Sequence, residues 1–276
     1  MTSNVRLNVT RFRVNANSLG PFWTICLWLF ASTSMSAQTS AQHDQQALKI
    51  IEQTVVAGGG QELITSVQDF TETGTVTYGW GDQPTGNVTV KGRGLHQFKI
   101  EADLSAGKLT TVVARDGGLL TEMNGWTRPI LRQSANDIGS LTLPLLSLIA
   151  AIQDSSASIV YGGLVAHDGA SAYDIRLQEV YTQQQDPGGN RGVREARDFY
   201  IDPKTFLITA ISDRVYFGGP SDTGVSHENL FSNYQPENGI MMPLTVVETV
   251  QGETGFTMTF SQVTFNSGLA DSDFAW

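Results

Sequence analysis

The side chains that could act as acids, bases or metal ligands are scattered in this sequence. Its four histidines, which do not have the spacing of a metal site, are His43, His96, His167 and His227. His167 precedes Asp168 and His227 precedes Glu228, so each dipeptide offers an imidazole and a carboxylate for proton transfer. Adjacent residues of a strand point to opposite faces, and neither pair therefore forms a local site. We interpret both pairs as exposed residues of loops or strand ends.

Motifs of the common enzyme classes are absent from the sequence. It contains no Gly-rich phosphate loop, no H-E-x-x-H pair and no G-x-S-x-G turn. Its 27 carboxylates guarantee some close pairs by chance, and we interpret Asp69 with Glu72, and Asp271 with Asp273, as solvated residues. The sequence predicts a protein that is not an enzyme and that uses no cofactor and no metal ion.

The first 37 residues have the pattern of a signal peptide. Three arginines and no acidic residue precede the short apolar run PFWTICLWLFAS, residues 21–32, and the small residues of TSMSAQ follow it. We expect cleavage near Ala37, which leaves residues 38–276 as a single domain in the periplasm. An uncleaved inner-membrane anchor is the alternative.

Charge argues against a nucleic-acid partner. The whole chain has a formal charge of −10. Cleavage would remove three of its 17 basic residues and none of its 27 acidic ones, which gives 14 − 27 = −13. Nucleic-acid binding depends on lysines and arginines that contact phosphates, and we find no basic cluster.

Hydrophobic periodicity predicts one helix followed by a mainly β domain. Ala47, Ile50, Ile51 and Val55 repeat at helical spacing, and the glycines at 58–60 end that helix. From residue 67 the period changes to two, as in LHQFKIEADL, where His96, Phe98, Ile100, Ala102 and Leu104 share one face and polar or charged residues alternate with them on the other. Near residue 260 the apolar positions change parity, which suggests a bulge or a strand end. We predict about ten antiparallel strands.

The run SLTLPLLSLIAAIQ, residues 140–153, is the most apolar segment in the body of the chain. It is too short to span a bilayer, which needs about 20 residues. Leu141, Leu145, Leu148, Ile149 and Ile152 share one face of the helix that it predicts. An open sheet with one apolar face must be covered, so we expect this inserted helix to be a lid.

A concave apolar surface under a lid is a candidate site for a lipid, an acyl chain or another hydrophobic ligand. The predicted ligand-binding residues are Val76, Tyr78, Trp80, His96, Phe98, Ile100, Leu145, Leu148, Ile149, Ile152, Phe256, Met258 and Phe260. His96 is placed on the apolar face, as a hydrogen-bonded core histidine or as part of the cavity lining. The alternative is that the helices seal a dry core and nothing binds.

Three arginines flank the predicted lid on its N-terminal side, at Arg115, Arg128 and Arg132. They could form surface salt bridges, or they could meet an acidic head group at the mouth of the cavity.

Four segments resemble the outer-membrane lipoprotein-carrier (LolA/LolB-like) superfamily. QALKIIEQTVVAGGGQELITSVQDFTETGTV resembles its first helix and strand, and DFYIDPKTFLITAI resembles its D-P-x-T-x-L hairpin. FSNYQPENGIMMPLTVVETVQGE and VTFNSGLADSDFAW are similar to later segments, so the resemblance runs from about Ala47 to Phe274.

The resemblance implies an exported, mainly β (α+β) protein: an open antiparallel half-barrel of eleven strands with an N-terminal helix and a helical lid. It also implies lipid binding, with roles in lipoprotein transfer or envelope homeostasis, and envelope proteins as partners. Arg93 is the nearest candidate for the functional arginine of the family; it could equally be an ordinary turn residue. The rival interpretation is an envelope interaction, structural or stress-sensing module whose cavity is filled by its own lid.

Overall fold

The computed structural model describes residues 43–114, 117–130, 141, 143–154, 157–180, 194–215 and 224–275, all within the unit 39–276. Three helices occur in these ranges: α1 (Gln45–Ala57), α2 (Gln61–Thr65) and α4 (Leu145–Gln153), with a 3₁₀ turn η1 (Asp271–Phe274) near the C-terminus. Among the described residues, none of these helices is both long and apolar enough to cross a membrane.

Helix α1 forms as its pattern predicts. The Asp44 side chain accepts hydrogen bonds from the backbone N–H groups of Gln46 and Ala47, which caps the N-terminus. The apolar stripe, including Ala47, is buried. Positive φ angles at Gly59 and Gly60 then turn the chain into α2.

The sheet has thirteen antiparallel strands. Their bounds are β1 (Asp69–Tyr78), β2 (Thr85–Arg93), β3 (Gln97–Leu104), β4 (Gly107–Ala114), β5 (Gly117–Thr121), β6 (Thr127–Ile130), β7 (Ser158–His167), β8 (Ala170–Val180), β9 (Arg194–Ile201), β10 (Ile208–Val215), β11 (Val225–Glu237), β12 (Ile240–Val250) and β13 (Glu253–Phe265).

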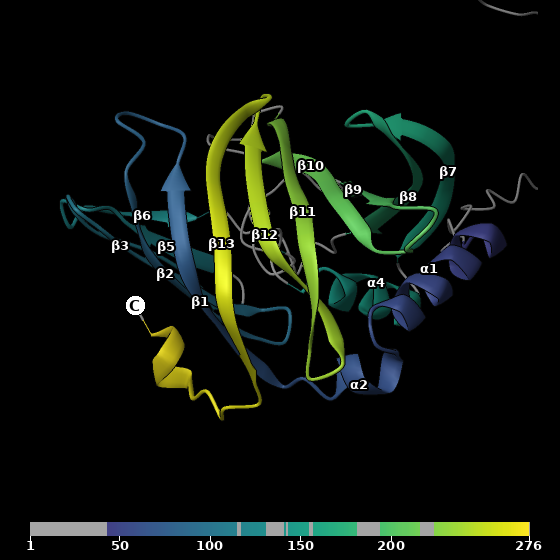
Figure 1. Cartoon of the computed structure of the whole chain (residues 1–276), viewed down its shortest axis with the longest axis horizontal. Helices are drawn as coiled ribbons and strands as arrows, with labels where there is room; N and C mark the ends of the chain where they lie inside the picture. The colour runs from purple at the N-terminus through teal and green to yellow at the C-terminus, as the bar shows by residue number, and fades with distance from the viewer. Residues whose placement is uncertain are drawn as a thin grey trace, which may run out of the picture. The chain divides into compact units, whose positions relative to one another are not determined.

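The strand order explains why a helix is inserted at mid-chain. The order is β6-β5-β4-β3-β2-β1-β13-β12-β11-β10-β9-β8-β7, so β6 and β7 are consecutive in sequence but lie at opposite edges of the sheet (Figure 1). The connection between Ile130 and Ser158 must therefore pass from one edge to the other, and α4 belongs to this connection. Helix α4 contacts α1, α2 and β7.

One face of the sheet carries the apolar core. Val76 pairs with Met258, Met258 pairs with Val246, and Val246 pairs with Phe231. Directly opposed residues of an antiparallel pair lie on the same face, and all four are buried. We call this the concave face.

A bulge in β13 keeps its apolar residues on the concave face. Phe260 pairs with Gly74 and Gln262 pairs with Thr73, so one extra residue, Ser261, separates the two registers. The predicted change of parity near residue 260 is confirmed as a bulge within one strand.

The sequence prediction of ten to eleven strands is two to three short of the thirteen observed, and the strands without a predicted counterpart are β6 and β11. Strand β6 has four residues, including Pro129, and lies at the sheet edge, where proline is tolerated. Strand β11 has polar residues, His227 and Asn229, at buried positions where an apolar pattern was sought.

Candidate functional site

Seven of the predicted site residues lie on the concave face as buried core residues. They are Val76, Tyr78, Phe98, Ile100, Phe256, Met258 and Phe260. Val76 and Met258 are fully buried, and Tyr78 packs edge-on against Phe256 with ring centroids 6.2 Å apart. The register therefore brings residues of β1, β3 and β13 into one apolar surface.

His96 does not belong to this surface, and its placement there is wrong. It is exposed in the turn between β2 and β3, because β3 begins one residue later at Gln97. His96 fits the alternating pattern of LHQFKIEADL only by chance, because it belongs to the turn that precedes the strand.

Helix α4 buries most of its predicted stripe. Leu145, Leu148 and Ile149 are buried in the hydrophobic core, with Leu148 at 0% exposure. Ile152 is 39% exposed, so the prediction that it faces the core is wrong. The helix ends at Gln153, and Ala151 in its last turn is buried while Ile152 and Gln153 are exposed.

Little space remains where the start of α4 meets the sheet. A cavity of about 10 Å³ lies between Leu143, Leu145, Ile208 and Tyr234. Burial raises the pKa of Tyr234, whose hydroxyl donates a hydrogen bond to the Ile208 carbonyl at 2.6 Å. The core under this end of α4 is therefore filled by side chains.

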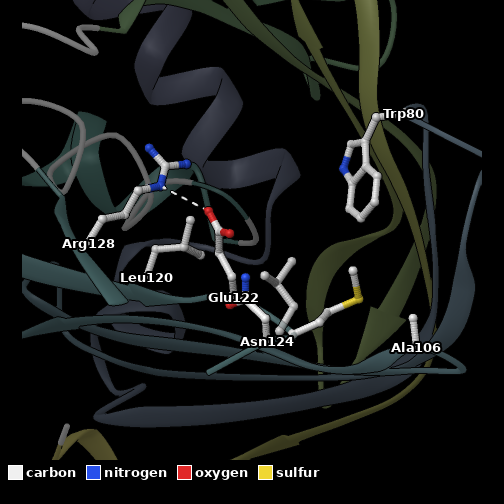
Figure 2. A pocket seen from close by; sticks show the side chains of 8 residues that line it. Trp80, Ala106, Leu120, Glu122, Asn124 and Arg128 are labelled. Carbon is white, nitrogen blue, oxygen red and sulfur yellow. Dashed lines mark ion pairs between the residues drawn. The ribbon is translucent and has the colours of Figure 1, made fainter. Parts of the chain in front are cut away.

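A larger pocket lies at the edge of the concave face, where the turn after β1 approaches β4, β5 and β6. Its volume is about 530 Å³, and it is lined by Trp80, Ala106, Leu109, Leu120, Glu122, Met123, Asn124 and Arg128. Figure 2 shows Trp80 and Arg128 on opposite sides of this space, with Ala106, Glu122 and Asn124 below them. Trp80 is 45% exposed, which leaves its indole accessible to a ligand in the pocket.

Arg128 is the cation of this pocket. Its Nε lies 3.8 Å from Glu122 Oε1, so the neighbouring carboxylate partly neutralises it (Figure 2). Both side chains are well exposed, and such a pair contributes little to stability. Arg115 and Arg132, which were grouped with Arg128 on the sequence, lie outside the described residues.

A cluster of polar side chains, which the sequence did not predict, lies on the concave face of β9–β12, and its members are buried except for the partly exposed Glu248. It consists of Arg197, Asp213, His227, Asn229 and Glu248. His227 Nδ1 is 2.6 Å from Asp213 Oδ1, and His227 Nε2 is 3.2 Å from Glu248 Oε1. Burial alone would lower the pKa of His227, but the two carboxylates raise it to about 10. The imidazole is therefore protonated at neutral pH and donates both of its hydrogens.

The interpretation of His227 as an exposed residue is wrong, whereas His167 does lie at a strand end, as the last residue of β7, but is less exposed than expected. His227 is buried, and the His167 side chain is largely covered. His167 Nε2 lies 2.8 Å from Glu228 Oε1, and its ring stacks on Tyr200 with centroids 3.7 Å apart. Each histidine finds its carboxylate on another strand, which no reading of adjacent residues could show.

Two of the four carboxylates interpreted as solvated are buried instead, whereas Asp271 and Asp273 lie in the 3₁₀ turn η1, with the Asp271 side chain 84% exposed. Glu72 is fully buried on the concave face, and Asp69 is buried. Burial acts to raise the pKa of Asp69, but its carboxylate accepts hydrogen bonds from the Ser267 hydroxyl and from the backbone N–H groups of residues 267–269, which together lower that pKa. Asp271 and Asp273 form ion pairs with Arg93 and Lys91. These groups hold the C-terminal segment against the sheet.

Arg93 contacts the C-terminal segment of the chain. Its guanidinium also donates to the Leu269 carbonyl at 2.9 Å and lies over the Phe274 ring at 5.4 Å from the centroid. Arg93 follows Gly92 in β2, and neighbouring residues of a strand face opposite sides of the sheet. Gly92 lies on the concave side, against the Phe70 ring. Arg93 therefore points away from the concave face.

Comparison with solved structures shows the same fold. A LolA superfamily protein from Nitrosomonas europaea matches with a TM-score of 0.51 and 11% identity over 83% of this chain and 97% of that chain. A DUF1329 family protein from Desulfovibrio piger matches with a TM-score of 0.51 and 12% identity over 83% and 97% of the two chains. No family model and no curated protein sequence matches the chain. At these identities the matches establish the fold.

Proposed function

We propose that this protein is exported to the periplasm and binds a lipid, an acyl chain or another hydrophobic ligand on the concave face of its sheet. The pocket of about 530 Å³ beside Trp80 carries this proposal, because it extends the apolar concave face to the protein surface. Leu109, Leu120 and Met123 provide apolar contacts there, and a volume of this size is within the range of small-molecule sites. The role is carriage or sensing of a ligand, without catalysis.

The fold supports this proposal by analogy. One matched structure is of a LolA superfamily protein, and the sequence resemblance points to the same superfamily. Lipoprotein transfer and envelope homeostasis are the processes that this analogy suggests.

A second candidate function is an envelope interaction or stress-sensing module with a self-filled core. The burial of Leu148 and the cavity of only about 10 Å³ near Leu145 favour it. The two candidates differ in whether the Trp80 pocket holds a ligand.

Native mass spectrometry of the protein isolated from its own envelope tests the proposal. We expect a chain that begins near Gln38 and a co-purifying hydrophobic molecule. Leu120→Glu should abolish the bound mass, because it places a carboxylate in the pocket. Leu119→Glu is the matched control, since Leu119 is equally half-buried but points to the other face of β5. A wild-type protein without any bound molecule would support the self-filled module instead.

A further inference from the structure

A row of aromatic side chains leads from Trp80, in the lining of the pocket, across the sheet toward the polar cluster. The Tyr78 ring lies 5.3 Å from Trp80 and 6.2 Å from Phe256, centroid to centroid. Phe256 pairs with Glu248 on β12, and Glu248 pairs with Asn229 on β11. Neighbouring strands are about 4.8 Å apart, so Glu248 lies only about 10 Å across the sheet from Tyr78. Burial raises the pKa of Tyr78, and the negative charge of Glu248 raises it further.

Asn229 leaves a hydrogen-bond acceptor without a partner on the concave face. The residue is 4% exposed, and its Oδ1 atom accepts no hydrogen bond from the residues that the structure describes. Asn229 pairs with Ile211, a core residue, which fixes its side chain on the concave side. An unsatisfied buried amide oxygen destabilises the free protein, and a donor supplied by a ligand would remove that cost.

Glu248 offers a second acceptor beside it. Its Oε1 atom accepts a hydrogen bond from His227, while its Oε2 atom lies over Gly255, where a Cβ atom would collide with it. The Glu248 side chain is 27% exposed, so a ligand can reach the carboxylate. His227 has no hydrogen left to donate, because both of its ring nitrogens are engaged by Asp213 and Glu248.

We infer that Glu248 and Asn229 form a polar subsite that accepts hydrogen bonds from the head group of an amphiphilic ligand. The head group is an ammonium or hydroxyl group, and the chain of the ligand occupies the Trp80 pocket. A carboxylate head group is disfavoured, because it would meet the charge of Glu248 and the acceptor of Asn229. This inference rests on the proposed function and specifies the polar end of its ligand.

Calorimetric titration with three amphiphiles of equal chain length tests the inference. The probes are dodecylamine, dodecanol and dodecanoate, each used below its micelle concentration at pH 7. We expect wild-type protein to bind dodecylamine at least about tenfold more tightly than dodecanoate. The reason is that the ammonium group can form a charge-assisted hydrogen bond with Glu248, and a bond of that kind contributes enough free energy for about a tenfold difference in affinity. Glu248→Gln should weaken dodecylamine binding about tenfold and dodecanol binding much less, because it removes the charge and keeps an acceptor.

Glu253→Gln is the matched control, since it removes the same charge at an exposed position of β13. It should leave all three affinities unchanged. Asn229→Leu is the second variant, and it decides the question if Glu248→Gln does not fold. It should raise the melting temperature by removing the unsatisfied oxygen, and it should weaken dodecanol binding several-fold.

The possible results separate the two proposals. Equal affinities for the three probes, or equal losses in Glu248→Gln and Glu253→Gln, would overturn the polar subsite and leave the hydrophobic site intact. If no probe binds the wild-type protein, the proposed function itself fails. If dodecanoate binds most tightly, the head-group assignment is reversed.

Discussion

Leu148→Asp tests whether α4 is a lid or a fixed part of the core. Leu148 is fully buried within a cluster that includes Leu145 and Ile149 on the same helix. Burial of these three aliphatic side chains contributes about 1.5–3 kcal/mol each, or about 5–9 kcal/mol in total. An aspartate at 148 loses one third of that contribution and adds a cost of several kcal/mol for an unpaired buried carboxylate. The two effects together are as large as the whole contribution of the apolar face, so α4 should leave its site.

The sheet should survive this change. The sheet consists of two runs of consecutive strands, β1 to β6 and β7 to β13, and in each run every strand pairs with its neighbour in sequence. The two runs are joined by the pairing of β1 with β13, which does not involve α4. Circular dichroism should therefore show retained β structure with slightly less helix. Binding of a hydrophobic dye should rise as the concave face is uncovered, and hydrogen exchange should accelerate in residues 145–153.

Ile152→Asp is the matched control on the same helix. Ile152 is 39% exposed, so the carboxylate stays in water and neither dye binding nor exchange should change. Cooperative unfolding of the whole domain by Leu148→Asp would refute the lid and favour the self-filled module. Unchanged dye binding with intact α4 would show that the burial argument itself is wrong.

Two further predictions concern the core and the buried charges. Phe98→Ala should lower the free energy of unfolding by about 3–5 kcal/mol in chemical denaturation, because Phe98 is 1% exposed. Lys99→Ala, on the opposite face, should cost less than about 1 kcal/mol; equal effects would contradict the register. The pKa of His227 rises from 6.5 to about 10 on folding, so its contribution to stability is complete below pH 6.5 and is lost as the pH rises through 10. Denaturation between pH 6 and 10.5 should show this loss, and His227→Gln should flatten the profile; a wild-type profile that is already flat would contradict the protonated state.

Local patterns in the sequence predicted much of the sheet and of α1. Phe98 and Ile100 alternate with charged residues, and they are buried as that period requires. The resemblance to the lipoprotein-carrier superfamily predicted the open sheet with an inserted helix, and this architecture is confirmed. These features depend on residues that are close in sequence or on segments in a recognisable order.

The end of a pattern was harder to predict than its existence. His96 continues the alternation of β3 but belongs to a turn, and Ile152 continues the stripe of α4 but extends beyond its cover. Which terminal residues of a helix or strand are buried depends on the elements that pack against it. The periodicity of its own sequence does not contain that information.

Only the tertiary structure decided where α4 lies and which polar groups meet. Helix α4 belongs to the connection that joins the two sheet edges, because β6 and β7 are the last strands of the two halves, which is a property of the whole strand order. His227 is 14 residues from Asp213 and 21 from Glu248, and antiparallel pairing of β10, β11 and β12 brings the three together. Such a cluster has no local signature, because its members are ordinary polar residues until the strand register makes them neighbours. The same register places polar residues at the buried positions of β11, and this is why β11, which carries Asn229 of the candidate polar subsite, is one of the two strands that periodicity does not reveal.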